Sequence, residues 1–208
     1  KCSICGEVIT AQTVIPITHD YAENIFIYDY SADKYYKICN ICDDSPEIAK
    51  SDLPASYGLK IKYGITEIEN AVFSFNDSLT SVSIPDTVTT IGVGAFQGCD
   101  GLTIVGVPSS VTTIGGNAFA DCSNLEEVIL SSNLSSNLTE IEEGAFSGCV
   151  KLERITIPNS VTSLGKSVFY GCKNLEEVTL SSGLTAIDDF TFYDCESLST
   201  ITIPNGIE

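Results

Sequence analysis

Four cysteines near the start of the 208-residue chain form the pattern with the most recognisable chemistry. Cys2 and Cys5 make one C-x-x-C pair, and Cys39 and Cys42 make a second. Two such pairs can supply the four thiolates of a tetrahedral Zn²⁺ site. The gap between the pairs is longer than in a usual zinc ribbon, but its apolar and aromatic runs are enough for two or three short strands that bring the pairs together. One hypothesis is therefore a zinc-ribbon-like β module over residues 1–45 that binds Zn²⁺.

The same cysteines allow two other interpretations. They could form disulfides or remain idle thiols in a partly ordered arm. They could also form a thiol-redox site, which would make the protein a redox enzyme. A redox C-x-x-C pair gains its low thiol pKa from a helix N-terminus or from basic neighbours. The residues around both pairs are mostly acidic and apolar, which disfavours the redox alternative.

Composition excludes several further classes of function. With 28 acidic against 10 basic residues, the net charge of −18 repels phosphate backbones and anionic lipid headgroups. We therefore expect no nucleic-acid partner. No apolar run reaches the roughly 18 to 20 residues of a spanning helix, so we expect no membrane insertion in this segment. His19 is the only histidine, which leaves the repeats without an imidazole base, and we expect no enzymatic activity.

The larger part of the chain repeats with a period of 23 residues. Each repeat begins with a phenylalanine. A cysteine lies three residues after this phenylalanine in every repeat but the first, and a leucine lies six residues after it in all of them. One interval is 27 residues long, because the segment 131–139 contains four extra residues. The phenylalanines are Phe73, Phe96, Phe119, Phe146, Phe169 and Phe192. Such a period indicates a stack of structural repeats.

Each repeat contains the signals of a strand and a bend. An alternating apolar pair, such as Val105 and Val107, follows each leucine and predicts a strand. A second apolar stretch follows where the repeat turns back. Glycines such as Gly115 suit a tight bend before the Ala-Phe pair. The Ala-Phe-x-x-Cys segment is expected to form one short helical or 3₁₀ turn.

No single 23-residue unit can close its own core, so the units must stack. We predict a β-rich, right-handed solenoid of parallel strands over residues 58–208, with the strands in one column. The acidic, proline-containing residues 46–57 are expected to form a linker to the N-terminal module.

The repeat pattern L-x-x-V-x-I-P-x-x-V-T-x-I-G-x-x-A-F-x-x-C resembles the BspA-like subclass of leucine-rich repeats. Residues 152–174 match it almost position by position, and the resemblance covers roughly residues 59–208. Thr87, Ser110, Ser160 and Gly183 stand where the commoner leucine-rich repeats have an asparagine or cysteine ladder.

The resemblance implies a non-enzymatic adhesion module that binds a protein or glycan, from a host or a matrix, on a secreted or cell-surface protein. Similar proteins also carry small cysteine-rich modules in which a histidine lies between C-x-x-C pairs. This gives the zinc hypothesis a second form, in which His19, Cys39 and Cys42 are an incomplete ligand set and Cys2 and Cys5 belong to a preceding module.

The five repeat cysteines are expected to be buried, free thiols. Stacked rungs bring their Cα atoms near enough for disulfides, but the Cβ vectors run parallel instead of converging. The sequence therefore predicts a ladder of unbridged thiols. These are Cys99, Cys122, Cys149, Cys172 and Cys195.

Residues between the inward apolar positions of each strand face outward and form two columns. Hydroxyl and β-branched residues dominate these columns, with one arginine between two glutamates. One interpretation is a ligand-binding face, and the alternative is a solvated strand face of a structural spacer. The predicted ligand-binding residues are Ser81, Ile104, Glu127, Arg154, Glu177 and Thr200, with Thr156 and Thr179 in the second column.

Overall fold

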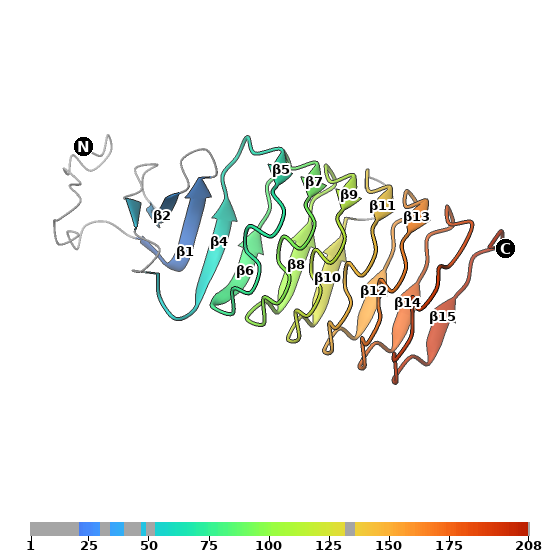
Figure 1. The fold of residues 1–208 in the computed structure, drawn as a ribbon. Helices are drawn as coiled ribbons and strands as arrows, with labels where there is room; N and C mark the ends of the chain where they lie inside the picture. The colour runs from blue at the N-terminus through green and yellow to red at the C-terminus, as the bar shows by residue number, and fades with distance from the viewer. Residues whose placement is uncertain (1–20, 30–33, 40–46, 49–52, 132–135, 208) are drawn as a thin grey trace.

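A computed structural model of the protein describes residues 21–29, 34–39, 47–48, 53–131 and 136–207. These residues wind into an elongated stack of rungs in which short strands lie side by side along the length of the molecule (Figure 1). The expected solenoid of parallel strands with 23-residue repeats is confirmed.

One sheet runs along the whole stack and contains the first strand of each rung. Its parallel members are β4 (Tyr57–Ile61), β6 (Leu79–Ser83), β8 (Ile104–Val107), β10 (Glu127–Leu130), β12 (Arg154–Thr156), β14 (Glu177–Thr179) and β15 (Thr200–Thr202). The register places residues 23 apart opposite each other, as with Val82 and Val105. Equivalent residues of successive rungs therefore form straight columns.

Two-residue strands form a second parallel sheet where each rung turns back. Its members are β5 (Glu67–Ile68), β7 (Thr90–Ile91), β9 (Thr113–Ile114), β11 (Glu140–Ile141) and β13 (Ser163–Leu164). The second residue of each strand is buried and the first is exposed or half-buried. The apolar stretches noted in the sequence are therefore strands as well as core positions.

The third side of each rung consists of turns, so the expected short helix or 3₁₀ turn is wrong. The amide of Ala95 donates to the carbonyl of Gly92 in its own rung, at 3.2 Å, whereas the amide of Phe96 donates to Ala118 in the next rung, at 2.8 Å. Alternate amides thus bond between rungs, which a helix with all its amides bonded internally does not allow. The alternation needs left-handed residues, such as Gly94 with a φ of 62°.

The glycine before the Ala-Phe pair has a different role from the one expected. Gly115 is not left-handed, but a Cβ atom added to it would lie 2.8 Å from backbone atoms of Gly92 and Val93. This is closer than real side chains approach the backbone. Glycine is required there because neighbouring rungs are in close contact.

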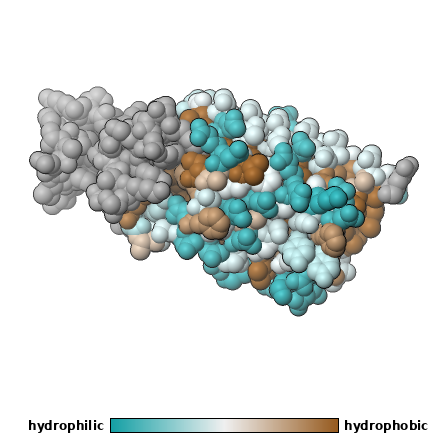
Figure 2. All heavy atoms as spheres, in the orientation of Figure 1, coloured by the Kyte–Doolittle hydropathy of each residue, from teal (hydrophilic) through white to brown (hydrophobic). Residues whose placement is uncertain are grey.

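The phenylalanine rings stack in a single row through the interior. Successive centroids lie 5.2 to 5.9 Å apart, with interplanar angles of 3 to 19°. Phe96, Phe119 and Phe146 are fully buried. By contrast, the surface visible in Figure 2 is mostly hydrophilic or neutral, with hydrophobic side chains in small groups. The hydrophobic driving force is therefore concentrated in the interior columns.

The repeat cysteines form a second column of free thiols, as expected, and all are buried except Cys195 of the last rung, which is half-buried. Each thiol donates to the carbonyl of a phenylalanine in the preceding rung, as Cys122 does to Phe96 at 3.1 Å. Burial raises the pKa of Cys99 and of Cys195 to about 11, and raises the pKa of Cys122, Cys149 and Cys172 as well. These thiols are protonated at neutral pH and are poor nucleophiles.

Hydroxyl groups of Thr87, Ser110 and Ser160, and Gly183 in a fourth rung, occupy the column where other leucine-rich repeats have an asparagine or cysteine ladder. The hydroxyl of Thr87 donates to Ile65 at 2.8 Å, and that of Ser110 donates to Val88 at 2.6 Å. Ser160 breaks this pattern, because its Oγ is buried and has no hydrogen-bond partner among the described residues.

A hairpin from the N-terminal segment extends the first sheet. Strands β1 (Tyr21–Asp29) and β2 (Lys34–Cys39) pair antiparallel, and β1 pairs in parallel with β4. Strand β3 (Glu47–Ile48) pairs with β2 and falls within the range expected to be a linker. The hairpin therefore covers the edge of β4 that would otherwise be exposed.

Candidate functional site

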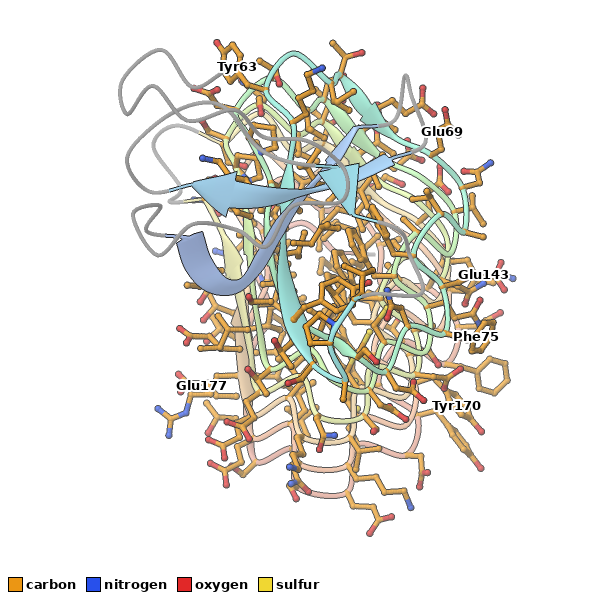
Figure 3. All side chains as sticks on the ribbon, turned by 90° about the vertical axis from the view of Figure 1, so that its left-hand side faces the viewer. Tyr63, Glu69, Phe75, Glu143, Tyr170 and Glu177 are labelled. Atoms are coloured by element: carbon orange, nitrogen blue, oxygen red, sulfur yellow. The ribbon has the colours of Figure 1, made fainter. Side chains whose placement is uncertain are left out.

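The structure places the predicted ligand-binding residues on one face. Six of them stand in a single register line across the first sheet, from Ser81 to Thr200, and Thr156 lies opposite Thr179 in the adjacent column. They are exposed, except that Thr179 is half-buried. In Figure 3, Glu177 of this face projects from the opposite side of the rung to Phe75 and Tyr170.

The backbone pairing between neighbouring strands of this face is shortest between β10 and β12. Strand β10 pairs with β8 at four positions, but with β12 only through Glu127 and Arg154. Strand β12 in turn pairs with β14 at three positions. This shortest pairing coincides with the rung that carries the four extra residues. A groove of about 480 Å³ lies there, lined by residues of both strands and by Glu126 and Glu153 just before them.

The groove is mainly acidic, with one arginine. Arg154 lies 3.9 Å from Glu176 and 4.0 Å from Glu177, both on the next rung, and Lys151 lies 3.9 Å from Glu126. All these side chains are well exposed, so each ion pair contributes at most about 1 kcal/mol. A partner can therefore displace Arg154 from the glutamates at little cost.

An apolar area accompanies these charges. Ile129 lines the groove and is 51% exposed, and Ile104 on the neighbouring strand is 48% exposed. Gly106 lies directly opposite Ile129 and leaves open space where a side chain would stand. Of the predicted face, the groove brings together Glu127, Arg154 and Thr156. Sequence reasoning missed Glu126 and Glu153, although the break in the repeat period marked the place.

The match to a family model decides which family these repeats represent. The model of the BspA type leucine-rich repeat region matches six copies, over residues 56–136 and 129–208. The chain belongs to the BspA-type leucine-rich repeat family. The resemblance noted in the sequence is therefore confirmed.

Solved structures include other leucine-rich repeat proteins similar to this BspA-type solenoid. A leucine-rich repeat protein of T. pallidum (TpLRR) is 28% identical with a TM-score of 0.68, and the match covers 74% of this chain and 73% of that one. The pneumococcal vaccine antigen PcpA is 21% identical with a TM-score of 0.54, over 77% of this chain and 54% of that one. A comparison with the curated proteins found no match.

The predicted zinc ligands of this BspA-type protein fall largely outside the described residues. Cys2, Cys5, Cys42 and His19 all lie outside them, and Cys39 is the last residue of β2. Within the part of the chain that the structure describes, no three histidine, cysteine or acidic side chains are grouped to hold a metal ion. The described residues also include no helix long and apolar enough to span a bilayer.

Proposed function

We propose that the chain is a non-enzymatic recognition module of a secreted or cell-surface protein, and that it binds a protein ligand through the groove between β10 and β12. The observation that supports this proposal is the groove itself. It combines an exposed isoleucine with opposite charges on a backbone that is paired with further strands on both sides. A rigid backbone loses little conformational entropy when a partner binds.

The chemistry of the groove favours a protein over a glycan. Protein interfaces have an apolar centre and a polar rim. Ile129 and Ile104 supply the apolar centre here, and Glu127 and Arg154 continue the register line of Ile104. Family membership adds support, because BspA-type repeats commonly mediate protein binding on cell-surface proteins. A host or matrix protein is the expected class of ligand.

The test is a binding screen of the full chain against purified matrix and cell-surface proteins, with a glycan array in parallel. For a ligand found there, Glu127→Lys and Arg154→Glu are expected to weaken binding at least tenfold, because they reverse the charges of the groove. Ser81→Lys is the matched control, since it changes a residue of the same column three strands away from β12 and should leave affinity unchanged.

Other results would overturn the proposal. Binding that is equal in all three variants would move the site away from the groove. A glycan ligand that is lost with the groove variants would replace protein by glycan recognition. A chain that binds nothing on either array would favour the structural spacer.

A further inference from the structure

Three exposed aromatic residues of the last two rungs gather on the turn side of the solenoid. Tyr170, Phe190 and Tyr193 are 42%, 61% and 57% exposed. The rings of Tyr170 and Tyr193 are stacked with centroids 5.3 Å apart, and Phe190 meets Tyr193 edge-on at 5.8 Å. We call these three residues the aromatic patch. Figure 3 shows Tyr170 on the side of the rung away from Glu177, so the patch is separate from the groove.

The solenoid does not need aromatic residues at these positions. Earlier rungs have small or polar residues at both of them. The equivalents of Tyr170 and Tyr193 are Ser74, Gln97, Ala120 and Ser147, and those of Phe190 are Ala71, Gly94, Asn117, Gly144 and Ser167. The patch is therefore a local addition to a framework that folds without it.

Phe190 is held in an unfavourable backbone conformation. Its φ is 58°, in the left-handed region that this turn position also adopts in the other rungs, with glycine at Gly94 and Gly144 and other residues at Ala71, Asn117 and Ser167. A side chain with a Cβ atom costs about 1–2 kcal/mol there. The ring is mostly exposed, so burial within this chain offsets little of that cost. The left-handed turn is part of the repeat, and the particular feature of Phe190 is that it places a large, exposed ring there.

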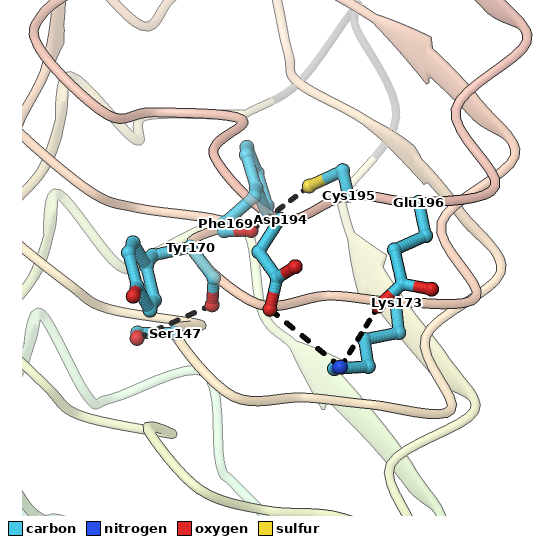
Figure 4. A network of polar contacts seen from close by, with 7 residues as sticks. All are labelled: Ser147, Phe169, Tyr170, Lys173, Asp194, Cys195 and Glu196. Atoms are coloured by element: carbon cyan, nitrogen blue, oxygen red, sulfur yellow. Dashed lines mark hydrogen bonds and ion pairs between the residues drawn. The ribbon is translucent and has the colours of Figure 1, made fainter.

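Acidic residues flank the patch in the sequence. Asp188 and Asp189 precede Phe190, and Asp194 and Glu196 follow Tyr193. Two lysines from the preceding rung face them. Lys173 lies 2.8 Å from Glu196 and 3.7 Å from Asp194, as Figure 4 shows, and Lys166 lies 3.5 Å from Asp189. Four carboxylates against two ammonium groups leave the rim negative, in keeping with the net charge of the chain.

We propose that the aromatic patch docks a lysine- or arginine-bearing segment of another protein. The aliphatic stems of these residues pack on aromatic rings, and a guanidinium also stacks on them. Their charged ends would reach the carboxylates of the rim. A neutral glycan fits less well, because it carries no positive charge to pair with the carboxylates of the rim. The charge complementarity therefore selects a basic protein segment.

The test measures binding of the full chain to a labelled eight-residue peptide of alternating glycine and arginine at physiological salt. Phe190→Gly and Tyr193→Ser are each expected to weaken binding about tenfold or more, as hot-spot residues do. Tyr63→Ser is the matched control, since Tyr63 is a 74% exposed tyrosine of the first rung, and it should bind as the unaltered chain does.

The Phe190→Gly variant separates binding from folding. Glycine relieves the left-handed strain, so the thermal midpoint should stay the same or rise while the affinity falls. Equal peptide binding by all variants would mean that the net charge of the chain attracts the peptide without the aromatic patch, and would overturn the proposal. Binding of a neutral oligosaccharide instead of the peptide would also overturn it. Phe190, Tyr193 and Tyr63 all lie outside the groove lining, so failure here is distinguishable from failure of the groove.

Discussion

Two aromatic neighbours in the sequence, Phe169 and Tyr170, belong to opposite parts of the molecule. Phe169 is fully buried between the rings of Phe146 and Phe192, whereas Tyr170 is 42% exposed. The inward column contains phenylalanine in every rung, because each ring must fit between two others. The outward column varies from serine to tyrosine, because no neighbour restricts it. Stability and recognition are thus divided between columns and not between segments of the chain.

The largest expected difference between these columns comes from removing a ring in each. Phe119→Ala should lower the free energy of unfolding by about 3–5 kcal/mol, because it leaves a cavity between two stacked rings. Tyr170→Ala should lower it by only about 1 kcal/mol, because the half-exposed ring loses its stacking on Tyr193 but leaves no cavity. Urea unfolding followed by circular dichroism measures both, and equal losses would contradict the division between columns.

The inward columns could be predicted from the sequence because their pattern repeats. A ring at Phe96 and another at Phe119 stand at the same place in successive units, so a regular stack brings them together. The same argument predicted which outward residues stand opposite one another. The structure confirms this register from Ser81 to Thr200. Periodicity therefore fixes which residues share a face.

Features that depend on departures from the period could not be predicted. The groove lies where β10 and β12 pair at one position, and an insertion of four residues indicates a loop but not its effect on the adjacent strands. The Ala-Phe-x-x-Cys segment forms turns and not the expected helix, because its backbone amides donate alternately within their own rung and to the next rung. That competition involves two repeats and is invisible in the pattern of either one.

The buried thiols predict a loss of stability in alkali. Because burial raises the pKa of Cys99 from 9.0 to about 11, the folded thiol keeps its proton at a pH where the unfolded thiol has lost it. The free energy of unfolding should therefore fall above pH 9, by about 1.4 kcal/mol per pH unit for this thiol, until the pH approaches 11. Urea unfolding from pH 8 to 10.5 under reducing conditions measures this slope.

A variant isolates the contribution of one thiol to that slope. Cys99→Ala is expected to be less stable at pH 8 because it leaves a small cavity, but its stability should fall less steeply with pH. An unchanged slope in this variant would show that other groups cause the alkaline loss.

The N-terminal cysteines are predicted to behave in the opposite way, as metal-bound thiolates instead of buried thiols. We expect about one zinc ion per purified chain, and loss of it in Cys39→Ser. The solenoid should unfold nearly as before, because only the N-terminal module loses a ligand. Elemental analysis of both proteins measures the zinc. Cys2→Ser distinguishes the two ligand sets, since it removes zinc bound by four cysteines but leaves a site of His19, Cys39 and Cys42 intact. A metal-free protein would contradict both sets.

The smallest expected effect compares two serines of the same interior column. Ser110 donates a 2.6 Å hydrogen bond to Val88, so Ser110→Ala should cost about 1 kcal/mol by leaving that carbonyl without its donor. The buried hydroxyl of Ser160 has no partner among the described residues, so Ser160→Ala should cost nothing and could gain up to about 1 kcal/mol. Paired urea unfolding curves resolve this difference. An equal loss in both variants would mean that the Ser160 hydroxyl is also satisfied, and the hydroxyl column would then be continuous through the rung next to the groove.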